Sequence, residues 1–276
     1  MICFYHGSDL DGHCSGAIIK HKYKYVTMVP VTYGRKIPTE LALDDVVYMV
    51  DFSLEPFQRM IGLREKSSEL IWIDHHSSSI ELSEKFDFNP PGIRRNDVAA
   101  CELVWEWCFP DIPIPKAVKL ISMYDVWNHN TSKDVVPFQL GLRAKYTLPD
   151  SRIWEVLFEN YLDIVDEIIS AGKYIQEYIN ADNERFMNAF SFETIFEGYN
   201  CICCNRGMVD SRIFDSKWDP KRHDLMVMFC RANNKWAVHL YTSHEGIDCG
   251  KIAKKYGGGG HKIAAAFRAK DLPFKI

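Results

Sequence analysis

The sequence predicts an α/β fold: a mostly parallel sheet with helices on both faces, a long connecting helix, and a second, smaller α/β domain. Three observations predict it. Short apolar runs alternate with helical patterns over residues 1–130, which is typical of a parallel sheet covered by helices. An apolar seam with spacings of three and four residues then runs over 154–178, and strand-like runs begin near 193. We therefore expect three regions, 1–150, 151–190 and 191–276.

Four short runs in the first region predict the strands of one buried sheet. Each run is apolar and rich in β-branched or aromatic residues, the composition of a strand with little contact to water. The runs are 2–5, 25–32, 46–50 and 70–73.

Helical patterns lie between and after these strands. Small and apolar residues over 13–22 suit a helix that packs close to the sheet. Ser53 is a good N-cap and Pro56 is tolerated in a first turn, so a second helix is expected to start there. Further helices are predicted over 98–108, opened by Asp97, and over 117–123.

One long helix is predicted after these elements. Pro149, Asp150 and Ser151 form a helix start signal, and the seam that follows is sustained enough for a helix of roughly 25 to 35 residues. The seam either covers one domain or connects two domains, with its apolar side against one of them or against a second subunit.

The last region reads as a smaller α/β domain. Its predicted strands are 199–204, 225–231 and 236–242. Asn233 and Asn234 lie between the last two strands and predict a hairpin turn. A short helix over 250–256 leads into four consecutive glycines, 257–260.

Composition narrows the class of protein. The 276 residues carry a net charge of −4, so there is no basic footprint for duplex DNA. No apolar run approaches the roughly 18 residues of a membrane span, and we expect no membrane partner. Several of the nine cysteines sit inside apolar runs, which suits buried reduced thiols in a cytoplasmic protein. Cys201, Cys203 and Cys204 suit strand packing better than a zinc site, because no CxxC pair accompanies them.

Acidic and histidine clusters stand where three of the predicted strands end. His6, Asp9 and Asp11 follow the first strand, Asp51 follows the third, and the triplet 74–76 follows the fourth. Ligands of open α/β sheets bind outside the carboxyl ends of the strands, so we expect these groups to share one crevice. Concentrated negative charge there needs compensation. A pair of divalent cations is the simplest source of it.

The donor types predict which cations. Asp51 lies where a carboxylate could bridge two ions, His75 could supply an imidazole, and Asp125 could complete the ligand set. Carboxylate and imidazole without thiolate suit manganese, magnesium, iron or cobalt. Two ions roughly 3.5–4 Å apart can create a bridging hydroxide and clamp a phosphoryl group.

Each cluster alone has a simpler explanation. An Asp-x-Asp pair is commonly a solvated turn, and a His-His pair is commonly one surface histidine and one with its hydrogen bonds satisfied. Asp125 alone could be a helix cap or a salt-bridge partner. The metal hypothesis rests on their conjunction at strand ends. The sequence also leaves two roles for Trp127, which could stack on a nucleobase or belong to the core.

These motifs together resemble the DHH phosphoesterase superfamily. The matching features are the triplet Asp74-His75-His76, the upstream Asp9-x-Asp11-Gly12, and the downstream glycine-rich segment that ends in His261. The resemblance is to the branch with the DHH-associated C-terminal domain, which includes nanoRNases, pAp phosphatases, cyclic-dinucleotide phosphodiesterases and RecJ exonucleases. It spans residues 6–267 and implies a metal-binding catalytic domain over 1–150 and a substrate-binding domain over 191–276.

The resemblance implies roles for individual residues. The first of two Mn²⁺ ions, for which Mg²⁺ or Co²⁺ could substitute, would be held by His6, Asp9 and Asp51. The second would be held by Asp11, His75, Asp125 and, as a bridge, Asp51. His76 would stabilise the transition state or transfer a proton to the leaving oxygen, and Asp74 would orient an imidazole. Many relatives have three residues between the first histidine and the first aspartate; here there are two, which leaves the ligand role of His6 to be tested.

The C-terminal motif implies a phosphate-binding segment. Relatives carry GGGHxxAAG, and here Gly258, Gly259, Gly260 and His261 begin the matching stretch, with Ala266 in place of its last glycine. Glycines let backbone N–H groups approach an anion closely, and His261 would donate a hydrogen bond to phosphate. The alternative is a flexible loop.

The resemblance implies a metal-dependent phosphodiesterase. The expected reaction is hydrolysis of short oligoribonucleotides or linear dinucleotides to 5′-mononucleotides, by a protein that could form a homodimer. Alternatives are a pAp phosphatase, a cyclic-dinucleotide phosphodiesterase, an inorganic pyrophosphatase or polyphosphatase, and a non-catalytic nucleotide-binding sensor.

Overall fold

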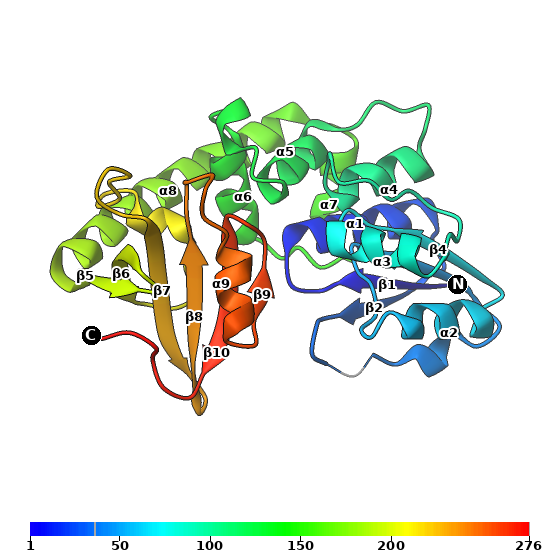
Figure 1. Ribbon diagram of the computed structural model, residues 1–276. Coiled ribbons are helices and arrows are strands. Elements are labelled where there is room, and N and C mark those ends of the chain that lie inside the picture. The colour runs from blue at the N-terminus through cyan, green and yellow to red at the C-terminus, as the bar shows by residue number, and fades with distance from the viewer. Residues whose placement is uncertain (36, 276) are drawn as a thin grey trace. The chain divides into compact units, whose positions relative to one another are not determined.

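The chain folds into two compact units, residues 1–176 and 177–276. The computed structural model describes residues 1–35 and 37–275, with the side chain of residue 130 left out. Position 276, the last of the predicted C-terminal domain, lies outside the described residues. The predicted α/β class is confirmed, because each unit is built on a β-sheet that packs against helices (Figure 1).

The sheet of the first unit is parallel throughout. Its strands are β1 (Ile2–His6), β2 (Thr27–Val31), β3 (Val46–Val50) and β4 (Glu69–Ile73), in the spatial order β2-β1-β3-β4. Successive side chains of a strand point to opposite faces. Cys3 and Tyr5 of β1 therefore join one hydrophobic cluster, while Ile2 and Phe4 join another.

Helices cover both faces of this sheet, as Figure 1 shows for α1 and α2. The cluster that contains Tyr5 is completed by helices α1, α4, α5, α6 and α7 and by the start of α8 (Leu162–Phe190), and the cluster that contains Phe4 by α2 and α3. The helices are α1 (Leu10–Lys22), α2 (Gln58–Lys66), α3 (Ser77–Lys85), α4 (Ala100–Cys108), α5 (Lys116–Asp125), α6 (Val135–Arg143) and α7 (Ile153–Phe158), with short 3-10 turns at Thr39–Ala42 and His129–Thr131.

Two predicted helix caps are wrong. Ser53 does not start α2, which begins at Gln58 without a side-chain cap; its hydroxyl instead forms a buried hydrogen bond of 2.8 Å with Ser79 Oγ. Asp97 does not open α4, which begins at Ala100. Ser53 is engaged by a residue 26 positions away, and the first N–H groups of α4 bond to the distant Asp11 in place of a local cap.

The long helix is present but starts later than predicted. It is α8 (Leu162–Phe190), 29 residues long, and a separate helix α7 precedes it. Asn160 lies between them with φ of +59°, a left-handed conformation that ends a helix. Its side chain accepts a hydrogen bond of 3.0 Å from the backbone N–H of Lys116. The apolar seam continues across this break, which is why the sequence reads as one helix.

The second unit has a mixed sheet of six strands. They are β5 (Phe192–Phe196), β6 (Tyr199–Asn205), β7 (Leu225–Ala232), β8 (Lys235–Tyr241), β9 (Gly259–Gly260) and β10 (Ala264–Ala269), in the order β5-β6-β7-β8-β10-β9. Helix α9 (Cys249–Lys255) covers one face, and a 3-10 turn spans Ser211–Phe214. The predicted hairpin at Asn233 is confirmed, because β7 and β8 pair antiparallel around it.

The cysteines belong to the packing of both units. All nine are free thiols, and eight of them are buried, as expected for reduced side chains that act as small apolar groups. Within the described residues, no helix combines the length and the apolar character needed to cross a bilayer.

Within the first unit, the start of helix α8 packs in backbone contact with α6. A Cβ atom added to Gly172 of α8 would lie 1.7 Å from the carbonyl oxygen of Pro137, and one added to Gly141 of α6 would lie 2.0 Å from that of Ile168. Real Cβ atoms do not approach so closely, so both positions require glycine for α6 and α8 to touch.

The Gly172→Ala variant tests this contact. The added methyl must push two helices apart, and we expect a loss of about 1–3 kcal/mol in the free energy of unfolding, the usual cost of overpacking. Gly62→Ala is the matched control, because Gly62 lies within α2 with open space around it, and alanine favours a helix by up to about 1 kcal/mol. Chemical denaturation of both variants measures the difference. Equal stability of the two variants would contradict the contact.

Candidate metal centre

The predicted clusters lie at the topological switch point of the first sheet, where the strand order reverses. The order β2-β1-β3-β4 places β2 on one side of β1 and β3 on the other, so β1 and β3 flank the switch point at which open α/β sheets bind ligands. His6 ends β1, Asp51 follows β3 and Asp74 follows β4. Parallel strands end at one edge, which brings the three clusters together there.

The six predicted metal ligands form two groups that could each hold an ion. Within each group, one ligand atom per residue lies within 4.8 Å of every other. One group is His6, Asp9 and Asp51, and the other is Asp11, His75 and Asp125; Asp51 also groups with His75 and His76.

His6 and Asp9 are held together by the tight turn from β1 into α1. His6 Nδ1 lies 2.9 Å from Asp9 Oδ2, and Asp9 caps α1 by accepting a hydrogen bond from the N–H of Gly12. A Cβ atom at Gly12 would lie 2.0 Å from the carbonyl oxygen of His6. Glycine at this position therefore lets the start of α1 pack directly against the end of β1.

Asp51 lies between the two groups. Its Oδ2 is 3.4 Å from His6 Nδ1, and its Oδ1 is 3.4 Å from His75 Nε2. The residue is 1% exposed and has φ of +56°, a left-handed conformation that costs a non-glycine residue of order 1–3 kcal/mol. The strained backbone turns the side chain so that each carboxylate oxygen faces a different imidazole.

Asp11 is fixed by the start of α4, a contact that the sequence does not reveal. Its two carboxylate oxygens accept hydrogen bonds from the backbone N–H groups of Ala100, at 2.9 Å, and Cys101, at 2.6 Å. Asp11 thus supplies the cap that was assigned to Asp97. Burial, with repulsion from Asp51, raises the pKa of Asp11 above its usual range.

His75 connects the second group. Its Nε2 lies 3.3 Å from Asp125 Oδ2 and 3.6 Å from Asp11 Oδ2. Burial lowers the pKa of His75, but Asp51, Asp11 and Asp125 outweigh burial and raise it to about 10. Asp125 ends α5 and is 30% exposed. Desolvation and repulsion from Asp11 raise the pKa of Asp125 to about 7.

Asp74 orients the two histidines that follow it. Its Oδ1 accepts hydrogen bonds from the backbone N–H groups of His75 and His76, at 2.8 and 3.2 Å. His76 Nδ1 lies 2.7 Å from the same oxygen. Burial lowers the pKa of His76, and the hydrogen bond to Asp74 outweighs burial and raises it to about 9. Because Nδ1 is hydrogen-bonded to Asp74, Nε2 is the nitrogen of His76 that can contact a ligand.

The cluster fits divalent cations. His6 Nδ1 and Asp51 Oδ1 are buried, and among the described residues neither makes a hydrogen bond of good geometry, although buried polar atoms are normally hydrogen-bonded. Their near neighbours are Asp9 Oδ2 at 2.9 Å and His75 Nε2 at 3.4 Å. Both atoms lie within the groups that could hold an ion. Oxygen and imidazole donors are those that Mn²⁺, Mg²⁺ and Co²⁺ accept. His6 therefore belongs to one of the groups that could hold an ion, despite its shortened spacing to Asp9.

The glycine-rich segment of the second unit is an ordered edge, in contrast to a flexible loop. Gly259 and Gly260 form β9 and pair with Ala266 and Ala265 of β10. A Cβ atom at Gly258 would lie 2.2 Å from the carbonyl oxygen of Ala266. His261 is exposed directly after β9. The segment presents a glycine backbone and one imidazole at the sheet edge.

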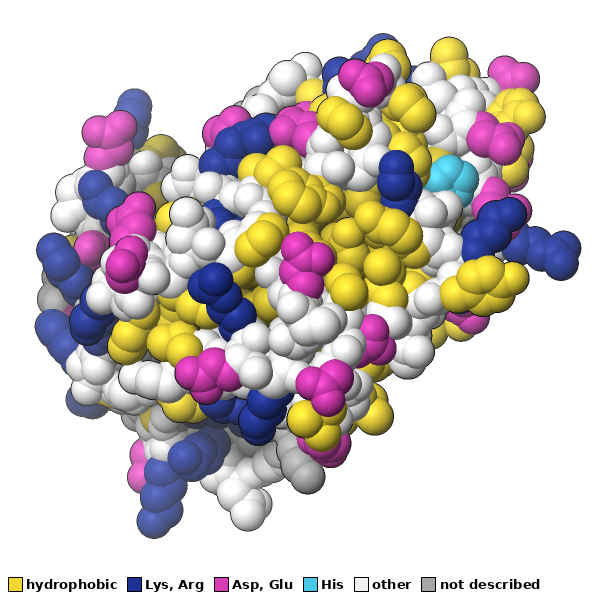
Figure 2. All heavy atoms as spheres, turned by 90° about the vertical axis from the view of Figure 1, so that its right-hand side faces the viewer, with side chains coloured by type: hydrophobic (Ala, Val, Ile, Leu, Met, Phe, Trp, Pro, Cys, Tyr) yellow, Lys and Arg dark blue, Asp and Glu magenta, His cyan; other side chains and the backbone are white. Residues whose placement is uncertain are grey.

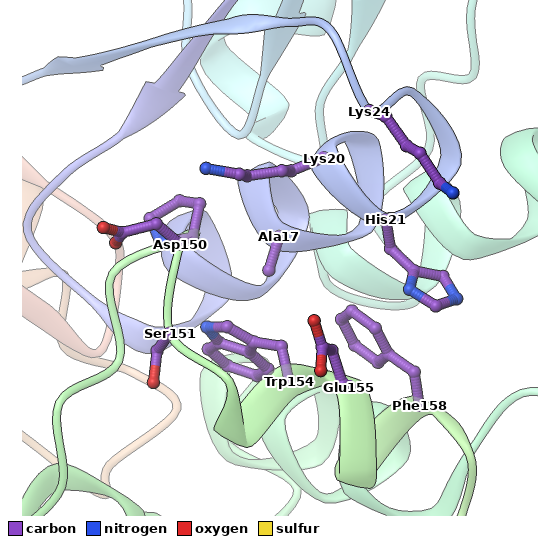
Figure 3. Close-up of a pocket in the computed structure, with 10 residues that line it drawn as sticks. Ala17, Lys20, His21, Lys24, Asp150, Ser151, Trp154, Glu155 and Phe158 are labelled. Atoms are coloured by element: carbon purple, nitrogen blue, oxygen red, sulfur yellow. The ribbon is translucent and has the colours of Figure 1, made fainter.

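A separate hollow of about 290 Å³ lies between α1 and the start of α7 (Figure 3). Apolar atoms of Ala17, Trp154 and Phe158 line it together with Lys20 and Glu155. None of the six predicted ligands lines this hollow, so it is distinct from the candidate metal centre.

Two curated proteins resemble the chain at low identity. The uncharacterized protein R106 of Acanthamoeba polyphaga mimivirus is 23% identical over 313 residues, which cover 99% of this chain and 69% of that protein. Oligoribonuclease NrnB of Bacillus subtilis (strain 168) is 20% identical over 317 residues, which cover 100% of this chain and 75% of that protein. No family model matches the chain.

Solved structures share the fold. The DHH domain of a member of a ribosomal protein family superposes with a TM-score of 0.64 at 12% identity, over 97% of this chain and 82% of that one. The pGpG-specific phosphodiesterase PggH from Vibrio cholerae gives 0.54 at 12% identity, over 97% and 92%. Exonuclease RecJ bound to manganese gives 0.52 at 16% identity, over 97% and 85%. The predicted resemblance to the DHH superfamily is confirmed at the level of the fold.

Metal binding should become stronger as pH rises. Without metal, the raised pKa of Asp125, about 7, means that this carboxyl stays protonated in the folded chain where it ionises in the unfolded one. The raised pKa of His75, about 10, favours a charged ring below that pH. The free energy of unfolding of the metal-free protein therefore falls as pH rises, from about pH 4 to 7 through Asp125 and from about pH 6.5 to 10 through His75. Cations need the deprotonated groups.

The measurement is thermal unfolding with excess Mn²⁺ and with chelator, at about pH 6 and about pH 8. We expect the rise in Tm caused by Mn²⁺ to be larger at the higher pH. A rise of the same size at both values, or a smaller one at the higher pH, would show that the metal does not compete with these protons.

Proposed function

We propose that the chain is a metal-dependent phosphoesterase that hydrolyses short oligoribonucleotides or linear dinucleotides to 5′-mononucleotides. The observation that carries this proposal is the position of Asp51, whose two oxygens face His6 and His75 at 3.4 Å each. A carboxylate in this position can be shared by two cations. His6, Asp9, Asp51, Asp11, His75 and Asp125 are the proposed ligands, and two Mn²⁺ the proposed ions.

The proposed cations would supply the nucleophile, and side chains of the protein would transfer the proton that the reaction needs. Two such ions would supply a hydroxide nucleophile at neutral pH and neutralise charge on a phosphoryl group. The bond between Asp74 and His76 Nδ1 leaves Nε2 to hold a proton. The raised pKa of His76, about 9, keeps that proton available at neutral pH. We assign to His76 the donation of this proton to the leaving oxygen, and to Asp74 the orientation of the ring.

The second unit is the proposed substrate-binding domain. Gly258, Gly259 and Gly260 would offer backbone N–H groups to a phosphate at one end of the substrate. His261, which is exposed, would add a hydrogen bond. Binding one end in this way would favour release of mononucleotides from that end.

The names of the similar proteins support a short nucleic-acid substrate. One is an oligoribonuclease, one is a pGpG-specific phosphodiesterase, and one is an exonuclease bound to manganese. The face of the molecule in Figure 2 carries lysine and arginine side chains interspersed with aspartate and glutamate. This mixture, with the net charge of −4, suits a small substrate held locally better than a long duplex.

Two variants test the site assignment. Asp51→Asn keeps a side chain that tolerates the left-handed backbone but removes the shared charge, and we expect it to lower Mn²⁺-dependent hydrolysis of the dinucleotide pApA by more than about 100-fold. His76→Ala should lower kcat by about 10²- to 10⁴-fold, the usual contribution of an acid catalyst. Release of AMP from pApA is the measured quantity.

Asp87→Asn is the matched control for Asp51→Asn. Asp87 also has a positive φ, +49°, but it is exposed and lies outside both ligand groups. It should retain wild-type activity. Full activity of folded Asp51→Asn or of folded His76→Ala would refute the assignment.

A further inference from the structure

Trp127 is a large exposed aromatic residue just after the end of α5, the helix that carries Asp125. Its side chain is 52% exposed, which excludes the core position that the sequence left open. It follows Asp125 by two residues, and Asp125 Oδ2 is 3.3 Å from His75 Nε2. The indole is therefore tied through a short stretch of backbone to one of the proposed ligands.

The backbone of Trp127 adopts a conformation that favours glycine. The N–H of Asn128 bonds to the carbonyl of Met123, and the N–H of Trp127 bonds to that of Tyr124. These two bonds close the C-terminus of α5 as a Schellman motif, in which Trp127 takes the left-handed position that glycine usually occupies. Its φ is +57°. A bulky residue in this conformation is an outlier, so the indole occupies a position that helix termination alone would give to glycine.

The indole is supported by flat groups on one side. The Trp127 ring lies 5.0 Å from the His129 ring at an interplanar angle of 30°. His129 in turn stacks on Tyr124 at 4.6 Å, and Arg143 lies over the Tyr124 ring at 5.5 Å. His129 Nε2 also lies 3.0 Å from the carbonyl oxygen of Tyr124. These contacts hold the indole in place, while about half of the side chain faces solvent.

We infer that Trp127 is a stacking platform for a nucleobase next to the phosphodiester that is cleaved. This inference rests on the proposed function, because it requires a nucleotide at the metal centre. An exposed, pre-positioned indole suits a nucleobase: stacking on an aromatic ring is favourable for every base and needs no hydrogen-bond readout. Trp127 would therefore position the substrate without taking part in the bond changes. It would favour purines, whose larger ring system stacks over more of the indole.

The test uses Trp127→Gly, which keeps the helix end because glycine favours its backbone conformation. Trp127→Phe restores a flat ring at the same position. Trp107→Ala removes another exposed indole, 38% exposed, from α4, and serves as the control. For each protein, the Kd of pApA and of pUpU is measured with Ca²⁺ in place of Mn²⁺, and KM and kcat are measured with Mn²⁺.

We expect Trp127→Gly to weaken pApA binding by about 5- to 150-fold, the range that corresponds to loss of one base–aromatic stack. Its KM should rise by a similar factor, while kcat changes less than about 3-fold. The preference for pApA over pUpU should shrink. Trp127→Phe should recover most of the binding, and Trp107→Ala should match the wild type.

The outcomes separate this inference from the proposed function. Unchanged Kd and KM for pApA in folded Trp127→Gly would overturn the inference and leave the function standing. A fall in kcat with unchanged Kd would also overturn it, since the indole would then act on the ligand Asp125. Binding that depends on Trp127 without any turnover by the wild type would support the platform and refute the phosphoesterase activity. A wild type that binds neither dinucleotide would refute both.

Discussion

The structure depends on how buried negative charge is compensated at one edge of the first sheet. Asp9, Asp11, Asp51 and Asp125 approach three imidazoles there, and Asp11 and Asp51 are almost fully buried. Hydrogen bonds from α4 satisfy Asp11 only in part, because burial and Asp51 still raise its pKa. Like charges at this separation are unfavourable without a counter-charge. The proposed shared cations would provide one, and protons on His6 and His75 provide another when cations are absent.

Local backbone features that are costly elsewhere build this edge. Gly12 lets α1 touch the end of β1, Asp51 takes a left-handed conformation, and Trp127 takes another at the end of α5. Strain of this kind persists where the surrounding structure imposes it, and it is common at functional sites. The sheet and the helices packed on it supply that constraint. The unit therefore exchanges some stability for the placement of its side chains, which is the usual relation between a rigid scaffold and a reactive centre.

The sequence predicts the strands of the first sheet and the grouping of the acidic and histidine side chains at their ends, because both follow from short-range patterns. The run 46–50 coincides with β3, and strand ends that carry Asp51 and the triplet 74–76 must meet in a parallel sheet. The errors come from contacts between distant residues. Asp11 caps a helix that begins 89 residues later, Asn160 interrupts a continuous apolar seam, and the alanines of β10 form a strand through pairing with β8. No local pattern distinguishes Ser53 or Asp97 from a true cap. The exposure of Trp127 likewise depends on the tertiary packing around α5.

The most direct test of a cation pair shared by Asp51 is to locate the cations themselves. Crystals grown with Mn²⁺ and measured near the manganese absorption edge would give an anomalous difference map. We predict two peaks about 3.5–4 Å apart, both within bonding distance of Asp51, one beside His6 and Asp9 and the other beside Asp11, His75 and Asp125. A single peak, or two peaks that do not share Asp51, would show that the buried charge is compensated in another way.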